Sequence, residues 1–128
     1  MASIVYLDTH VVAWLYGLGA KALSAPAADV VRSADSLRIS PMVRLELQYL
    51  YEIGRLAERP APVLDELNAT LGLSLCQAPF AAAVHRAAGQ NWTRDPFDRL
   101  IVAQAALHDA MLVTKDKTMH THYARAIW

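Results

Sequence analysis

Short apolar runs alternate with helical segments along the chain, and this alternation limits the folds open to it. Residues 3–7 form the first run, which is apolar at every position after Ser3, and residues 111–114 form another. Uninterrupted apolar character is typical of strands buried on both faces, as in parallel sheets. Parallel strands are joined by right-handed crossovers, which place helices on both faces of the sheet. The sequence therefore predicts an α/β fold with three α/β/α layers around a short central parallel sheet.

Glycine, proline and capping residues set the expected boundaries of the elements. Ser24, Ser40 and Asp95 are expected to cap helices, and Pro41 and Pro96 suit a first helical turn. Helices are predicted over residues 9–16, 24–34, 41–54, 62–71, 79–88 and 96–108. Strands are predicted over residues 3–7, 37–39, 73–76, 111–114 and, at the edge of the sheet, 125–128.

Length and composition exclude several classes of protein. A chain of 128 residues suits one domain, and its single cysteine, Cys76, excludes an internal disulfide framework and an all-cysteine zinc site. Twelve basic and twelve acidic residues cancel, which excludes a chain-wide basic surface but not a local basic patch. No apolar run is long enough to cross a membrane, so a cytoplasmic protein is expected. The 55% hydrophobic fraction favours an apolar surface for a partner.

Two aspartates follow predicted strands. Asp8 comes directly after the strand at 3–7, and Asp116 comes shortly after the strand at 111–114. Open α/β sheets bind ligands at the carboxyl ends of their strands, so both residues lie at a favoured position. Each also has a simpler interpretation, because Asp8 suits a helix cap and Asp116 suits a turn.

A glutamate is expected on the apolar side of the helix at 41–54. Arg44, Gln48, Glu52 and Arg55 form a polar stripe that must face water. Glu46 points nearly opposite this stripe, where a carboxylate costs several kcal/mol unless it binds a cation or pairs with an arginine. Its apolar neighbours on that side, expected to be buried, are Met42, Leu45, Tyr49, Leu50 and Ile53.

A fourth acid, Asp98, lies in the first turn of the helix at 96–108, where Asp95 already serves as the cap. The helix N-terminus favours a carboxylate by about 0.3–1 kcal/mol, and this benefit alone could account for Asp98. Convergence on one pocket explains Asp8, Glu46, Asp98 and Asp116 together. Two such charges about 5 Å apart repel by roughly 3 kcal/mol at an effective dielectric constant near 20. Several of the acids are therefore protonated, with a raised pKa, or they surround a hard cation such as Mg²⁺ or Mn²⁺.

Four segments carry a resemblance to a known family. They are YLDTHVVAWL at 6–15, Ile39-Ser-Pro with Glu46, DPFDRLIVAQ at 95–104 and LVTKD at 112–116. Together they resemble a PIN-domain ribonuclease, most closely the VapC-type toxin of a VapBC toxin–antitoxin pair. The resemblance implies one PIN-like nuclease domain over residues 1–128. It also implies that Asp8, Glu46, Asp98 and Asp116 are the metal-binding acids, and that Thr114 orients the last acid or a metal-bound water.

The same resemblance implies a Mg²⁺- or Mn²⁺-dependent endoribonuclease in which a metal-activated water cleaves RNA. The implied partners are a small antitoxin and a second copy of the chain, whose contacts are expected at Val43, Leu47 and Tyr51 and on the apolar helix at 96–108. Some family members carry a further acid where this chain has Lys117 and Thr118. The cations that would hold RNA phosphates, or else remain solvated surface charges, are Arg94, Arg99, Lys115 and Lys117.

Three alternatives come from other classes of protein. A phosphoacceptor receiver domain needs an acidic pair at the first strand, and Leu7 and Thr9 flank Asp8. A haloacid-type phosphatase needs Asp-x-Asp, and position 10 is His10. A PIN-like module that only binds a protein partner is the remaining alternative, against which the presence of all four acids argues.

Several other residues have a possible chemical role beside a simpler one. His120 and His122 form either a metal-binding pair or an exposed loop pair, and His10 is expected to pack. Cys76 is expected to be a buried strand residue. The tryptophans, which either stack on bases or belong to the core or an interface, are Trp14, Trp92 and Trp128.

Overall fold

A parallel sheet forms the centre of the protein, whose structure is a computed structural model describing residues 3–128. Over that range the sheet has five strands in the order β3-β2-β1-β4-β5, and every neighbouring pair is parallel. The predicted α/β fold is therefore confirmed, with the last strand at one edge. The strands are β1 (Ile4–Leu7), β2 (Ser36–Ile39), β3 (Ser74–Leu75), β4 (Met111–Val113) and β5 (Ala126–Ile127).

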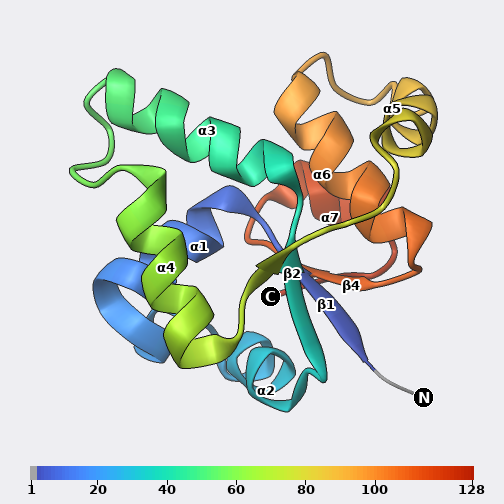
Figure 1. Ribbon diagram of the computed structural model, residues 1–128. Coiled ribbons are helices and arrows are strands. Elements are labelled where there is room, and N and C mark those ends of the chain that lie inside the picture. The colour runs from blue at the N-terminus through green and yellow to red at the C-terminus, as the bar shows by residue number, and fades with distance from the viewer. Residues whose placement is uncertain (1–2) are drawn as a thin grey trace.

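Helices cover both faces of this sheet. Figure 1 shows α1, α2 and α4 on one side and α5 and α6 on the other, while α3 packs against α1, α4 and α6. The bounds are α1 (Thr9–Leu18), α2 (Ala25–Ser33), α3 (Pro41–Glu52), α4 (Pro60–Leu71), α5 (Phe80–Ala88), α6 (Pro96–Leu107) and α7 (Lys117–His122), with a 3-10 turn at Gly19–Ala22. None of the helices within residues 3–128 has the length and apolar character needed to cross a membrane.

The predicted helix caps are confirmed. Ser24 Oγ accepts the Ala27 amide at 3.2 Å, and Ser40 Oγ accepts the Met42 amide at 3.0 Å. Asp95 caps α6 in the same way. Helix α4 begins two residues before the predicted position, because Pro60 itself occupies the first helical turn.

Helix α7 was not predicted, because its six residues are too few to show a helical period. Asp116 caps it, and it contains His120 and His122. The interpretation of these two histidines as an exposed loop pair is therefore wrong about the loop, although both side chains are exposed.

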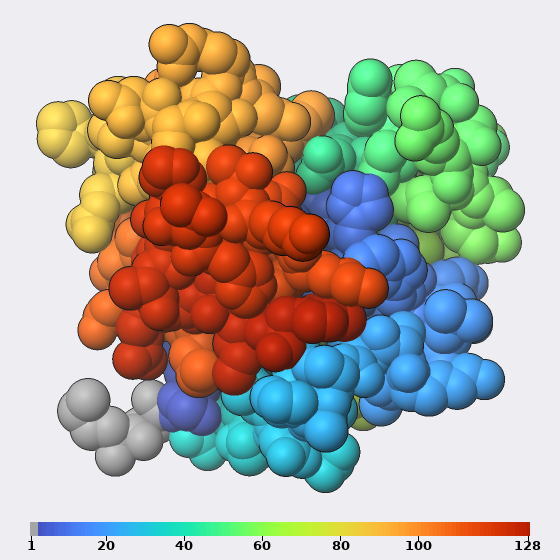
Figure 2. Space-filling view, turned by 180° about the vertical axis from the view of Figure 1, so that it is seen from behind, coloured from blue at the N-terminus to red at the C-terminus, as the bar shows by residue number. Residues whose placement is uncertain are grey.

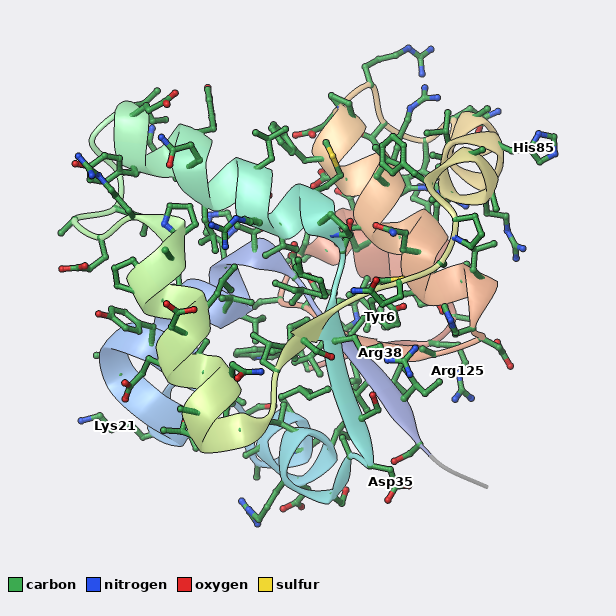
Figure 3. All side chains as sticks on the ribbon, in the orientation of Figure 1. Tyr6, Lys21, Asp35, Arg38, His85 and Arg125 are labelled. Carbon is green, nitrogen blue, oxygen red and sulfur yellow. The ribbon has the colours of Figure 1, made fainter. Side chains whose placement is uncertain are left out.

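The core lies between the sheet and its two helical layers. Tyr6 of β1 is fully buried, and its hydroxyl lies 3.2 Å from Nδ1 of His108 at the end of α6. Figure 3 shows Tyr6 beside Arg38, its register partner on β2. The apolar surface of α6, expected to contribute to an interface, is instead buried against the sheet and α5, since Ile101 and Ala103 are fully buried.

The buried side of α3 differs from the prediction. Val43 and Leu47, expected at an interface, are 0% and 1% exposed, whereas Leu45, Tyr49 and Ile53, expected in the core, are 53%, 49% and 49% exposed. The helix carries two adjacent apolar stripes, and helical periodicity does not distinguish which of them faces the core. The packing of α3 against α1, α4 and α6 determines which of the two stripes is buried.

The order of the strands creates a switch point beside β1. The chain passes from β1 outward to β2 and β3, and it then returns to the other side of β1 to form β4 and β5. Ligands in open α/β sheets bind where the strand order reverses, outside the carboxyl ends of the strands. Asp8 and Thr114, which follow β1 and β4, lie at this point.

Candidate active site

Asp8 is buried at the carboxyl end of β1, with an exposed fraction of 6%. Its Oδ1 accepts the Thr9 amide at 2.8 Å as the cap of α1, and its Oδ2 accepts the Thr114 hydroxyl at 2.8 Å. Burial raises the pKa of Asp8, and the hydrogen bonds from Thr114 and Thr9 oppose that rise. Asp8 is thus a helix cap and also a buried acid at the switch point.

Thr9 connects the first acid to Glu46 of α3, a role that the sequence did not indicate. The buried Thr9 hydroxyl donates to Glu46 Oε1 at 2.5 Å. The described part of the chain contains one ion pair, between Arg32 and Asp29, so no arginine neutralises Glu46. Burial raises the pKa of Glu46, as do the nearby charges of Asp8 and Asp95.

Asp98 is a third carboxyl group whose pKa is raised by its surroundings. It lies half-buried in the first turn of α6, and burial raises its pKa to about 7. The charges of Asp95, Asp8, Glu46 and Asp116 add to that rise. Asp95 Oδ1 accepts the Phe97 and Asp98 amides, as expected of the cap. The expectation of raised pKa values is therefore confirmed for Asp8, Glu46 and Asp98.

Asp116 reaches the same edge of the sheet through its position after β4. Its Oδ1 accepts the Met119 amide at 2.9 Å as the cap of α7, and its own amide donates to the Thr114 hydroxyl at 3.0 Å. His120 Nε2 donates to the Thr114 carbonyl oxygen at 2.6 Å. The Thr114 hydroxyl therefore joins Asp8 to the backbone of Asp116, two segments far apart in the sequence.

The acids approach one another without forming a complete ligand set. Among residues 3–128, no three Asp, Glu, His or Cys side chains are grouped closely enough to hold a metal ion as they stand. Their chemistry nevertheless fits a hard divalent cation, because the donors are oxygen atoms. Such an ion would also offset the loss of solvation and the repulsion between carboxylates, which together raise the pKa of Asp98.

The candidate phosphate-binding cations differ in how they are held. Arg99 Nε donates to the Thr93 carbonyl at 2.8 Å, and Arg94 Nη1 donates to the Asn91 carbonyl at 3.1 Å. Lys115 Nζ lies 5.8 Å from the centre of the Trp128 ring, and Lys117 is exposed at the start of α7.

The remaining candidates have different surroundings. His10, expected to pack, has an exposed side chain whose ring centre lies 6.1 Å from that of Trp14. His122 stacks on Trp92, whereas His120 contacts the Thr114 carbonyl oxygen. The two histidines therefore contact different residues. Cys76 is buried, as expected, but it follows β3, which ends at Leu75, and does not belong to the strand.

Replacing Thr114 with valine is expected to reduce the free energy of unfolding by about 1–3 kcal/mol, because the buried Asp8 carboxylate and the part-buried Asp116 amide lose their partner. Urea denaturation measures this loss. Thr118→Val removes a hydroxyl from an exposed position of α7 and is the matched control. Equal stability of the two variants would contradict a supporting role for Thr114.

A parallel sheet with acids at its switch point is typical of an α/β protein that binds a ligand there, and similarity to known proteins identifies the family. The chain belongs to the PIN domain family, whose model matches residues 5–125. It is 34% identical over 124 residues to Ribonuclease VapC22 of Mycobacterium tuberculosis, an alignment that covers 92% of this chain and 91% of that protein. The resemblance predicted from the sequence is confirmed, and the receiver and phosphatase alternatives are excluded.

Solved structures show the same fold. A chain of the VapBC2 crystal structure from Rickettsia felis, bound to a DNA fragment from its promoter, superposes with a TM-score of 0.65 at 19% identity. That match covers 97% of this chain and 96% of the other. A chain of a toxin–antitoxin complex from Klebsiella pneumoniae gives a TM-score of 0.64 at 14% identity, with the same coverage.

Proposed function

We propose that this chain is a divalent-metal-dependent endoribonuclease and the toxin of a toxin–antitoxin pair. In this proposal residues 1–128 act as a single nuclease domain in the cytoplasm. The observation that carries it is the pKa of Asp98, raised to about 7 by burial and by the charges of four other carboxylates. Perturbed carboxyl groups at the end of a sheet are typical of a functional site. The similarity to a protein named as a ribonuclease supports RNA as the substrate.

In this proposal Asp8, Glu46, Asp98 and Asp116 hold Mg²⁺ or Mn²⁺. When bound, the ion provides a nucleophilic water at neutral pH and offsets negative charge on the phosphate. The protein's own hydroxyl groups orient the acids, since Thr114 donates to Asp8 and Thr9 donates to Glu46. The cations proposed to hold phosphates on either side of the cleaved bond are Arg94, Arg99, Lys115 and Lys117.

Sequencing of RNA ends after brief expression tests the proposed activity. New ends at defined sites are expected with the natural chain and not with Asp8→Asn, which removes one negative charge with little change in shape. The same ends from both proteins would contradict the proposal. Absence of new ends with either protein would favour the alternative, a PIN domain that acts only by binding a protein.

We also propose two protein partners, an antitoxin and a second copy of the chain. Leu45, Tyr49 and Ile53 form an exposed apolar stripe along α3, and Tyr49 lies 6.2 Å from the half-buried Phe97 ring. Exposed apolar residues grouped in this way are typical of protein interfaces.

Light scattering of the purified chain is expected to give the mass of a dimer at micromolar concentration, and Leu45→Lys is expected to shift the mass toward a monomer. Leu71→Lys alters an exposed leucine on α4 and is the matched control. A monomeric natural chain, or equal effects of the two variants, would contradict a dimer formed through α3. Co-expression with a neighbouring small open reading frame tests the antitoxin separately.

A further inference from the structure

Two tryptophan rings from opposite ends of the chain meet beside the candidate active site. Trp14 lies on α1, the helix that Asp8 caps, and its ring centre is 5.8 Å from that of Trp128. Trp128 follows β5, where the Ile127 carbonyl accepts the Thr114 amide at 3.0 Å. Figure 2 shows the red C-terminal segment lying against the blue N-terminal helix on this face.

Both rings are packed against the protein and are also partly accessible. Trp14 and Trp128 pack against the hydrophobic core, and each remains partly exposed. Their planes meet at 67°, so the edge of one ring points to the face of the other. A ring that presents only its edge keeps both of its faces clear of its partner. The ring that presents its edge can therefore offer a flat face to a ligand.

Cationic and polar side chains border the two rings. Lys115 Nζ lies over one face of the Trp128 ring, 5.8 Å from its centre, and Lys115 stands in the sequence between Thr114 and Asp116. The exposed His10 ring lies 6.1 Å from Trp14. An aromatic surface with a lysine beside it matches a nucleotide, whose base stacks and whose phosphate is negative.

The third tryptophan, Trp92, also packs against the core and is partly exposed, but a second ring is stacked on it. Trp92 is stacked nearly parallel on His122, with ring centres 5.2 Å apart and planes inclined by 6°. Its Nε1 donates to Gln90 Oε1 at 2.7 Å. One face and the polar edge of Trp92 are thus already in contact with the protein.

We propose that Trp14 and Trp128, together with Lys115, bind an unpaired base of single-stranded RNA next to the phosphate that is cleaved. This inference rests on the proposed ribonuclease function and assigns a base-binding site to it. Bases inside a duplex are stacked on their neighbours and do not reach an aromatic side chain, whereas bases in single strands and loops do. Duplex RNA is therefore a poor ligand.

Tryptophan fluorescence tests the stacking directly. A Trp92→Phe protein restricts the emission to Trp14 and Trp128, and EDTA prevents metal-dependent cleavage during the titration. A short single-stranded oligoribonucleotide is expected to quench this emission, and the duplex of the same sequence is not. In an anisotropy assay with a labelled strand, Trp14→Leu and Trp128→Leu are expected to weaken binding by about 5- to 150-fold.

Two further variants separate stacking from folding. Trp128→Phe keeps an aromatic ring and is expected to retain most of the affinity. Trp128→Leu preserves a similar apolar contact with the core but has no ring, so it is expected to bind more weakly. Phe80→Leu alters an exposed aromatic residue on α5 and is expected to bind RNA as the natural chain does. Equal affinity of the Leu and Phe variants at position 128 would overturn the proposal.

The remaining outcomes distinguish this inference from the proposed activity. Unchanged RNA affinity in the Trp14 and Trp128 variants of a chain that cleaves RNA would overturn the stacking site alone. Quenching by single-stranded RNA in a chain that never cleaves would support the site and contradict the nuclease. Unchanged RNA affinity combined with a changed oligomeric mass would overturn the proposal and assign the pair to a protein interface.

Discussion

The Asp98→Asn protein is expected to cleave RNA at least about 100-fold more slowly than the natural chain, because it lacks a charge needed at the proposed metal site. Asparagine has nearly the shape of aspartate, and Asp95 rather than Asp98 caps α6. The fold should therefore remain. Initial rates with a labelled RNA in Mn²⁺, measured alongside circular dichroism, give the result.

Glu46→Gln is expected to behave in the same way, since it also removes one charge from the group. Asp65→Asn removes a carboxylate from the exposed surface of α4 and is the matched control for both. Cleavage by Asp98→Asn and Glu46→Gln at the rate of Asp65→Asn would show that these acids do not act in catalysis.

In EDTA, the natural chain is expected to be less stable at about pH 7.5 than at about pH 5, to an extent that depends on Asp98. The pKa of Asp98 is about 7 in the folded state and near 4 in the unfolded state. Between these values the folded state holds more protons, so stability falls as pH rises through the window and stays lower above it. Solvent around the half-exposed side chain limits the effect to about 1–2 kcal/mol.

Divalent metal is expected to reverse this loss at neutral pH, because it binds the deprotonated acids of the folded state. A ligand at about 100 times its Kd adds roughly 2.7 kcal/mol, which raises Tm by roughly 10 °C for a domain of this size. Asp98→Asn is expected to be more stable than the natural chain at about pH 7.5 in EDTA, and to respond less to Mn²⁺.

Thermal melts at the two pH values, with EDTA or with Mn²⁺, measure both effects. Asp65→Asn again serves as the control, since it should follow the natural chain under every condition. Melts in which Asp98→Asn and the natural chain show the same pH dependence, and in which Mn²⁺ stabilises neither, would contradict a shared cation site.

The expected acids were visible in the sequence because each lies at a position with a local signature. Asp8 follows an uninterrupted apolar run, Asp116 follows another, and Asp98 comes after a cap and a proline. Local patterns of this kind indicate which residues of a segment are buried and where a helix begins. They were sufficient to predict the strands, the caps and the end of the sheet where the acids lie.

Packing between segments decided the rest. Two apolar stripes compete on α3, and contact with α1, α4 and α6 buries Val43 and Leu47 while leaving Leu45 exposed. Glu46 meets the Thr9 hydroxyl rather than an arginine because α3 packs against α1.

The meeting of Trp14 with Trp128 is a further case, because the two residues stand near opposite ends of the sequence. Its geometry depends on how α1 and the edge strand β5 lie around the sheet. The sequence by itself determined the strands, the longer helices and the polar residues at their ends, because these follow from interactions between near neighbours. The tertiary structure alone decided which side chains touch, because that depends on how distant segments cross.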